Sequence, residues 1–503
     1  MTGLRTQLLM LLVSTACSTE FTPQPCSLDG DCGNGLVCEQ RDQQAVCVRV
    51  EDVPLIIGQS APVSGTNQAL GTNMKLGIEL AFKEKNAVGG IRGRELQLDF
   101  RDDAYQPDLA EAAARNLIDV QVSQTVVPRC PTTAAPVVAN TIPVSSTALN
   151  RGPNAVLAIL GNVGTPTMVR SAPVAIETGT VFFGAFTGAS TLLRDTTSGP
   201  CGRYIFNVRA SYAQEAQATV EYFKKKGVTS YKNLVSFDQL DSFGQNGYDG
   251  LVAAFKSTFG AFPGNADPIN PIFRVRYVRN DDTSVPAQVA ATETYLTQLL
   301  AADTSGGPVT IGIMMTDTYG AGADFIQTLR TWQWDGQATP ANKATRLKLF
   351  FSNVSFVGAN ALADRLKAAG KVPLSGDNYF TDNVVVSQVV PNYQSDSSDV
   401  VSAYNKLIAQ SGAAPSFTSL EGYIAARVFI AGLDAHKGPF TSASIVDSFE
   451  KLPDLGLGIG ATSGFSSTNH QYSNSVWGTI LQPDGSFKNL YFWSVGIPIQ
   501  FFE

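Results

Sequence analysis

The sequence predicts an α/β protein built from doubly wound parallel sheets. Short apolar runs that suit buried parallel strands alternate with segments of helical period, and the unusual residues gather in the loops that follow the strands. Of the 503 residues, 44% are hydrophobic and 16% are charged, so the chain has enough apolar side chains for a large core. Its length suggests two such lobes and one smaller module.

The first elements show this alternation most clearly. Residues 54–58 form an apolar run typical of a buried strand, and the small, polar loop 59–65 follows directly. Four apolar residues at four-residue spacing then predict a helix, namely Leu70, Met74, Ile78 and Phe82. We expect a second strand over 96–100 and a second helix over 108–118, with a proline near its first turn.

Later segments continue the pattern. We expect a strand over 155–160 and an amphipathic helix over 420–434. The run Lys224-Lys225-Lys226 lies where a helix should end. Its positive charges are therefore expected to complement the negative end of the helix dipole rather than to bind an anion. Residues 119–154 contain several prolines and hydroxyl clusters, and they are interpreted as an insertion of unknown role.

The N-terminus is typical of an export signal over residues 1–16. A basic start, a short apolar core and small residues precede Cys17. The arrangement resembles a bacterial lipoprotein signal, which would make Cys17 the lipidated first residue of the mature chain. The alternative is cleavage at about Ala16 without a lipid. Either way, six apolar residues are too few to span a bilayer.

The other six cysteines favour disulfides in an exported protein. Within a module over 17–51, two bridges are expected among four of them, with three connectivities open: Cys26, Cys32, Cys38 and Cys47. A zinc site is the alternative there, but the spacings lack paired C-x-x-C knuckles. Cys130 and Cys201 remain, and we expect them to pair across the insertion.

The order of short motifs resembles one known family. The first strand is followed by a Ser-Gly loop, a long helix ending in Gly-Gly-Ile-Arg-Gly and a strand ending in Asp-Asp. Further matching pieces are 161–167, 186–189, 206–212, 242–245, 353–358, 419–426 and 469–471. Together they resemble the leucine/isoleucine/valine-binding proteins, type I periplasmic binding proteins that serve ABC transporters.

This resemblance implies a lobe organisation. The family chain passes between two lobes three times, and here the crossovers should fall near 206–208, 385–387 and 472–477. Lobe I would comprise residues 52–206 and 387–472. Lobe II would comprise residues 207–386 and 473–503.

The candidate ligand residues of lobe I follow from a rule of open parallel sheets. Ligands bind outside the carboxyl ends of the strands, where helix N-termini favour anions. The candidate ligand residues lie in the loops at those ends and match positions of the family: Ser60, Ser64, Thr165, Phe186, Thr187 and Gly188. Such hydroxyls would hold the carboxylate of an amino acid, and the alternative for each is simple helix capping.

Lobe II offers a second set of candidates, namely Asp241, Phe243, Asp317, Tyr319 and Ser355. Phe243 matches the family position where an aromatic ring covers the ligand. Ser355 stands where branched-chain amino-acid binders carry an acidic residue for the ligand's ammonium group. Either Asp317 or Asp241 supplies that charge instead, or the ligand is not an α-amino acid.

These observations exclude several other functions. A net charge of −7 argues against a nucleic-acid surface. The two histidines, His436 and His470, lack a metal spacing and a nearby nucleophile motif, so we expect no enzyme, no metal and no cofactor. The prediction is a periplasmic, lipid-anchored solute-binding protein that takes an amino acid or related small polar molecule and delivers it to ABC permease subunits. The alternative is a sensor module that signals to a membrane partner.

Overall fold

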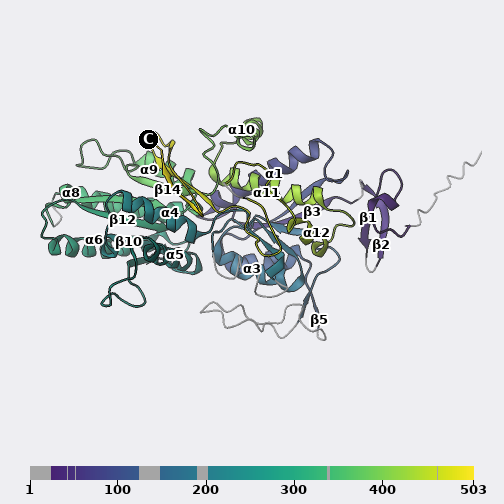
Figure 1. The fold of residues 1–503 in the computed structure, drawn as a ribbon, viewed down its shortest axis with the longest axis horizontal. Helices are drawn as coiled ribbons and strands as arrows, with labels where there is room; N and C mark the ends of the chain where they lie inside the picture. The colour runs from purple at the N-terminus through teal and green to yellow at the C-terminus, as the bar shows by residue number, and fades with distance from the viewer. Residues whose placement is uncertain are drawn as a thin grey trace, which may run out of the picture.

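The computed structural model describes residues 24–41, 44–50, 53–123, 148–189, 202–336, 340–460 and 463–502. Two sheet-and-helix lobes lie side by side along the long axis of the molecule, and a small module of two strands lies at one end (Figure 1). The predicted fold class is confirmed, because five parallel strands with helices packed on them form the sheet of lobe I and the larger part of the sheet of lobe II.

The sheet of lobe I has five parallel strands in the order β4-β3-β7-β8-β9. Their bounds are β3 (Leu55–Ala61), β4 (Leu96–Asp102), β7 (Ala158–Leu160), β8 (Val181–Phe183) and β9 (Ile205–Phe206). The lobe's helices are α1 (Gln68–Ala87), α2 (Pro107–Leu117), α3 (Thr165–Thr178), α10 (Asp399–Ser411), α11 (Phe417–Ala435) and α12 (Ser442–Phe449). Helices α1 and α11 touch closely, because a Cβ on Gly77 would lie 2.0 Å from the Ser419 carbonyl oxygen.

The sheet of lobe II has eight strands in the order β11-β10-β12-β13-β14-β15-β16-β17. The first five are parallel and the last three are antiparallel: β10 (Leu234–Gln239), β11 (Phe273–Tyr277), β12 (Val309–Thr316), β13 (Leu347–Asn353), β14 (Val384–Gln388), β15 (Ser475–Leu481), β16 (Phe487–Ser494) and β17 (Ile497–Phe501). The helices are α4 (Tyr212–Lys225), α5 (Ser242–Phe259), α6 (Val285–Ala302), α7 (Tyr319–Trp334), α8 (Lys343–Arg346) and α9 (Ala359–Ala369).

The chain passes between the two sheets after β9, after β14 and before β15. Two of these crossings are bonded to each other. The Asn207 amide donates to the His470 carbonyl at 2.7 Å, and the Ser473 amide donates to the Val208 carbonyl at 3.0 Å. The paired crossings form a short backbone hinge, while the exact limits of the lobes stay a prediction.

Several predicted elements take on definite bounds. The run of three lysines closes α4, which ends at Lys225. The ends of the predicted insertion form an antiparallel ribbon of β5 (Gln121–Ser123) and β6 (Ala148–Asn150). Residues 124–147 between them lie outside the described residues, as do Cys17, Cys130 and Cys201. Lipidation and the third disulfide therefore stay predictions.

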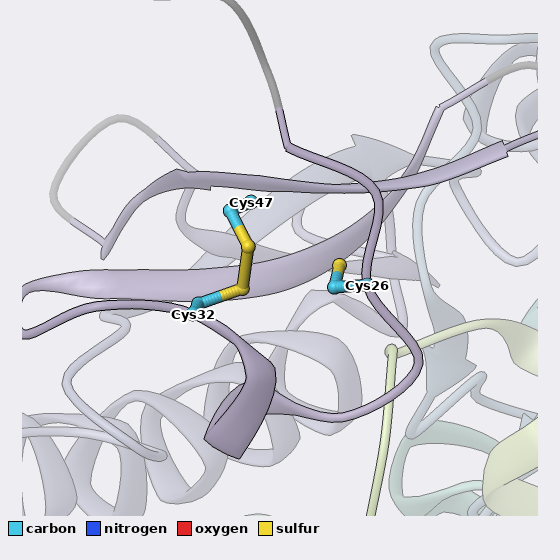
Figure 2. A group of neighbouring side chains, drawn as sticks. All are labelled: Cys26, Cys32 and Cys47. Carbon is cyan, nitrogen blue, oxygen red and sulfur yellow. A yellow bond between two sulfur atoms is a disulfide. The ribbon is translucent and has the colours of Figure 1, made fainter.

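The N-terminal module consists of η1 (Asp29–Asp31) and the antiparallel pair β1 (Leu36–Arg41) and β2 (Gln44–Arg49). Of the three possible connectivities, the structure has Cys26–Cys38 and Cys32–Cys47. Figure 2 shows the second bridge beside the sulfur of Cys26. Because all four sulfurs are bonded in pairs, the thiolates that a zinc site would need are already used.

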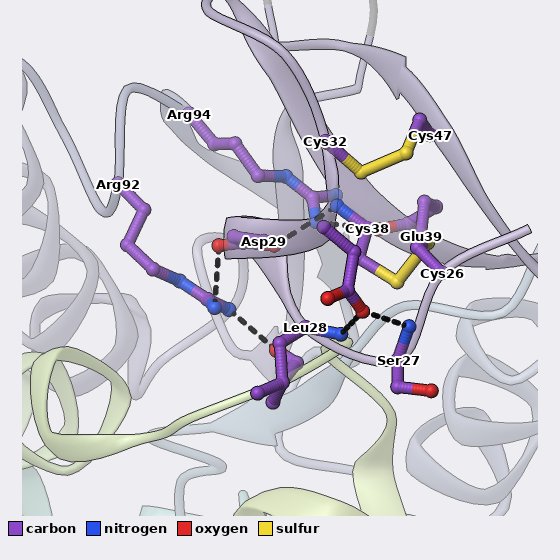
Figure 3. The surroundings of a disulfide bond; sticks show 12 residues. Cys26, Ser27, Leu28, Asp29, Cys32, Cys38, Glu39, Cys47, Arg92 and Arg94 are labelled. Carbon is purple, nitrogen blue, oxygen red and sulfur yellow. Dashed lines mark hydrogen bonds and ion pairs between the residues drawn. A yellow bond between two sulfur atoms is a disulfide. The ribbon is translucent and has the colours of Figure 1, made fainter. Parts of the chain in front are cut away.

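Two arginines of lobe I fix the module in place (Figure 3). Arg92 pairs with Asp29 at 2.6 Å, and Arg94 pairs with Glu39 at 2.5 Å. The Arg94 side chain is only 3% exposed and also donates to the Val53 carbonyl. The module is therefore bonded to the end of lobe I that lies far from lobe II (Figure 1). Within the described part of the chain, no helix has both the length and the apolar composition needed to cross a membrane.

Candidate ligand-binding site

The structure brings part of both predicted sets together between the lobes. Thr165, Phe186 and Thr187 lie at the strand ends of lobe I, and Phe243 reaches the same place from the first turn of α5 in lobe II. Each of the four is at most 1% exposed. This region, which we call the cleft, is therefore closed in the structure.

The two threonines form a pair of hydroxyls beside the N-terminus of α3. Thr165 is the first residue of that helix, and its Oγ1 lies 2.7 Å from Oγ1 of Thr187. The residue that caps the helix is Gly164, whose φ of 101° suits glycine alone. The Thr165 hydroxyl is thus not used as the helix cap, and it stands where the helix dipole favours an anion.

Four rings fill the centre of the cleft, and we call them the aromatic cluster: Tyr105, Phe186, Phe243 and Phe356. The Phe356 ring centroid lies 4.8 Å from that of Phe243, 5.0 Å from that of Phe186 and 5.9 Å from that of Tyr105. Tyr105 and Phe186 belong to lobe I, whereas Phe243 and Phe356 belong to lobe II. The cluster is therefore a direct apolar contact between the lobes.

A charged group lies next to these rings, and we call it the hinge cluster: Arg209, Glu215, Ser355 and Glu421. The Arg209 guanidinium pairs with Glu215 at 2.8 Å and with Glu421 at 3.2 Å, and it donates to the Ser355 hydroxyl. Burial alone would lower the pKa of Arg209, but the carboxylates of Glu421 and Glu215 outweigh it and raise the pKa. One guanidinium thus faces two carboxyl groups there, and Glu215 also accepts a hydrogen bond from the Ser387 hydroxyl at 2.6 Å.

Ser355 is hydrogen-bonded to the Glu215 carboxyl group. Its amide donates to Glu215 at 2.7 Å and its hydroxyl lies 3.0 Å from the same carboxylate. Asp241 instead accepts from the Phe243 amide and pairs with Arg279 at 2.9 Å. A carboxyl group, that of Glu215, thus lies directly beside Ser355, whereas the Asp241 carboxylate is bonded to Arg279 and to the Phe243 amide.

Asp317 lies at the end of β12 and is completely buried. No described residue other than its own backbone donates to its carboxylate. Burial therefore raises its pKa well above the ordinary value, which favours the neutral acid. Its carboxyl lies against the backbone of Gly322 in α7, because a Cβ there would be 2.1 Å from Oδ2.

The remaining predicted residues of lobe I have local partners. The Ser60 hydroxyl donates to Asp103 at 2.6 Å, and burial raises the pKa of Asp103 to about 7. Ser64 is exposed and hydrogen-bonds to Asp102. Gly188 must be glycine, because a Cβ there would lie 2.5 Å from the Tyr212 ring.

Three further contacts close the two lobes on each other. Asn67 Nδ2 donates to Asn280 Oδ1 at 2.8 Å, and the Tyr319 hydroxyl donates to the Thr66 carbonyl. Gln239 also donates to the Tyr105 hydroxyl, at 3.3 Å. Tyr319, predicted as a ligand residue, thus makes a contact that holds the lobes together.

Sequence reasoning did not single out five residues of this site: Tyr105, Arg209, Glu215, Phe356 and Glu421. Some signals were present. Arg209, Phe356 and Glu421 lie inside segments that match the family, and Tyr105 follows the Asp-Asp pair at the end of β4. Tyr105 also has a φ of 58°, a conformation uncommon for residues other than glycine and concentrated at functional sites.

Comparison with known proteins supports the family resemblance. A model of the family described as "Periplasmic binding protein" matches residues 54–155 and 153–486. A Leu/Ile/Val-binding protein homolog 2 from Brucella abortus is 34% identical over 64 residues, which are 13% of this chain and 17% of that protein. The chain thus matches the curated relative over only a small part of its length.

Solved structures match over much more of the chain. A possible leucine/isoleucine/valine-binding protein from Rhodopirellula baltica is 28% identical, with a TM-score of 0.65, and the match covers 88% of this chain and 98% of that one. A fatty acid ABC transporter substrate-binding protein from Thermomonospora curvata, 14% identical, has a TM-score of 0.61 over 88% of this chain and 92% of its own and shares the fold alone. Because the family model spans both lobes, the chain belongs to the periplasmic binding protein family.

Proposed function

We propose that this protein is the extracytoplasmic solute-binding component of an ABC importer and that it binds an amino acid or a related small polar molecule between its lobes. The observation that carries the proposal is the meeting of the threonine pair of lobe I with Phe243 of lobe II in one buried cleft. The family and the Leu/Ile/Val-binding relatives support the same ligand class.

The two ends of an α-amino acid find complementary groups in the cleft. The ligand's carboxylate accepts hydrogen bonds from Thr165 and Thr187 beside the N-terminus of α3. Its ammonium group pairs with a carboxylate of the hinge cluster, Glu421 or Glu215. Opening about the paired crossings exposes both groups to the solvent, and closure completes their contacts with the ligand.

The rest of the proposal concerns location. The mature protein is held at the membrane by a lipid on Cys17, and its ligand passes to permease subunits. Replacing Cys17 with serine should release the protein from membranes into the soluble fraction, whereas an unchanged distribution would exclude this anchor. In an exported protein, thiol titration after denaturation without reductant should also find essentially no free thiol among the other six cysteines.

Native mass spectrometry of the purified protein tests the ligand class directly. We expect a mass increment that matches an amino acid or a similar polar molecule, and this increment should disappear on denaturation. Titration calorimetry with L-leucine, L-phenylalanine and L-alanine then shows which ligand side chain gives the highest affinity. If neither a bound small molecule nor heat of binding with these probes is found, the amino-acid assignment is wrong.

A further inference from the structure

Phe356 lies where the predicted ligand contacts of the two lobes meet. It belongs to η6 (Ser355–Val357), a single turn that follows β13, and its ring is 0% exposed. Phe186 flanks it from lobe I and Phe243 flanks it from lobe II, at 5.0 and 4.8 Å between centroids. The ring therefore fills the space between the two side chains that were expected to contact the ligand.

The polar groups around this ring are satisfied by one another. The hydroxyls of Thr165 and Thr187 bond to each other, and the hinge cluster pairs internally. Tyr105 packs against Gly164, so that a Cβ there would lie 2.3 Å from the tyrosine ring, and it closes the side next to the threonines. The closed cleft is thus complete, with a benzyl group from the protein at its centre.

We propose that Phe356 occupies the apolar subsite of the cleft and that the ligand displaces it on binding. The inference rests on the proposed function and adds to it the class of side chain. The favoured ligand is a carboxylate that carries an apolar group about as large as a benzyl group, because only such a group restores the contacts that Phe356 gives up.

The location of Phe356 suits displacement. A single turn of 3₁₀-helix has few backbone hydrogen bonds, and Gly358, with a φ of 80°, follows it directly. The neighbouring Ser355 belongs to the hinge cluster and its amide donates to Glu215, so a shift of this turn reaches the proposed ammonium site. Entry of a ligand would therefore couple the apolar subsite to the charged one.

This role predicts the sign of a mutational effect. Contacts of Phe356 with Tyr105 and Phe186 of lobe I stabilise only the closed form without ligand, so their loss should strengthen binding. The contact between Asn67 and Asn280 joins the lobes outside the aromatic cluster, so its loss should weaken any binding that requires closure. Asn67 makes no side-chain cap to α1, which makes Asn67→Ala a clean control for loss of an interlobe contact.

The experiment compares Phe356→Ala, Asn67→Ala and the parent protein by calorimetry with L-phenylalanine and L-alanine, and by small-angle X-ray scattering without ligand. We expect Phe356→Ala to bind L-phenylalanine about ten-fold more tightly and to gain nothing for L-alanine. Its radius of gyration without ligand should exceed that of the parent. Asn67→Ala should bind L-phenylalanine more weakly than the parent.

The remaining outcomes separate this inference from the proposed function. Weaker binding of L-phenylalanine by Phe356→Ala would show that the ring is a wall of the ligand site and would overturn the inference while leaving the function intact. Unchanged scattering of the variant would overturn it as well. A more open variant that binds neither probe supports the role of Phe356 in closure and contradicts the amino-acid ligand instead.

Discussion

The two sides of the cleft are held together by different kinds of interaction. On the lobe I side, Thr165 and Thr187 share a neutral hydrogen bond of 2.7 Å. On the other side, Arg209 is 2% exposed and pairs with two carboxylates. A ligand can exchange a neutral hydrogen bond for its own at little cost, whereas a buried ion pair is expensive to break.

This difference assigns separate tasks to the two sides. The hinge cluster joins α4 of lobe II to α11 of lobe I next to the backbone crossings, so it holds the lobes in register. Thr165 and Thr187 both belong to lobe I, and the Thr187 side chain also hydrogen-bonds to Tyr212 of α4. These are bonds between neutral groups, so opening the pair costs less than breaking the buried ion pairs. We therefore propose that the neutral side exchanges its hydrogen bonds with the ligand's carboxylate, whereas the charged side keeps the lobes in register and offers a carboxylate to the ligand's ammonium group.

The largest expected effect comes from removing the buried cation. Arg209→Met leaves Glu215 and Glu421 without their arginine in a buried position. We expect the free energy of unfolding to fall by roughly 3–5 kcal/mol in denaturant titrations. A loss below about 1 kcal/mol would contradict the structural role of the hinge cluster.

An exposed ion pair provides the matched control. Lys371 pairs with Asp377 at 2.8 Å, and the two side chains are 51% and 98% exposed. Lys371→Met removes the same number of charges in water, so it should leave the free energy of unfolding close to that of the parent. The contrast between the two variants isolates burial as the cause.

The next effect tests whether the lobe I side is neutral at physiological pH. Burial raises the pKa of Asp103 to about 7 from an ordinary 3.8. Between these values the folded protein holds a proton that the unfolded chain has released. Asp103 therefore contributes stability that is complete below about pH 4 and is lost as the pH rises through 7.

Asp103→Asn removes this titration and keeps a partner for the Ser60 hydroxyl. As the pH rises from about 4 to about 7, we expect the parent to lose roughly 2–4 kcal/mol of unfolding free energy relative to the variant.

Asp102→Asn is the control, because the pKa of Asp102 is shifted in the opposite direction. Burial would raise the pKa of Asp102, but hydrogen bonds from Ser64, Ala104 and Val63 lower it overall, so its stabilisation is lost only as the pH falls below the ordinary value. Parallel pH profiles for the parent and Asp103→Asn would contradict the shift.

Local patterns in the sequence predicted the strand ends and thereby part of the site. The apolar run 54–58 and the helix that follows it correspond to β3 and α1, because hydrophobic period reports burial directly. Thr165, Phe186 and Thr187 were placed at strand ends by the same logic, since parallel strands share one carboxyl edge.

The residues that were missed depend on contacts between distant parts of the chain. Glu421 lies within a helix whose apolar stripe was evident, but its partner Arg209 is 212 positions away. An isolated phenylalanine such as Phe356 cannot be told from core by composition, because most phenylalanines are buried. The connectivity of Cys26, for its part, was one of three that the spacing allowed.

The smallest effect on stability, paired with a clear effect on binding, is expected at the threonine pair. Thr165→Val keeps the shape of the side chain but removes the hydroxyl that bonds to Thr187. We expect a loss of about 1 kcal/mol in unfolding free energy and a weakening of L-leucine or L-phenylalanine binding by roughly 1.5–3 kcal/mol, the range for a hydrogen bond to a charged group.

The other end of the same helix offers the control. Thr178 Oγ1 lies 2.9 Å from Thr180 Oγ1 in a second buried hydroxyl pair, outside the cleft. Thr178→Val should therefore lower stability by a similar amount and leave affinity unchanged in calorimetry. If both variants weakened binding equally, the loss of affinity in Thr165→Val would come from destabilisation of α3 rather than from a lost hydrogen bond to the ligand. If neither did, the ligand's carboxylate would bind elsewhere in the cleft, and the proposed carboxylate site at the threonine pair would be wrong.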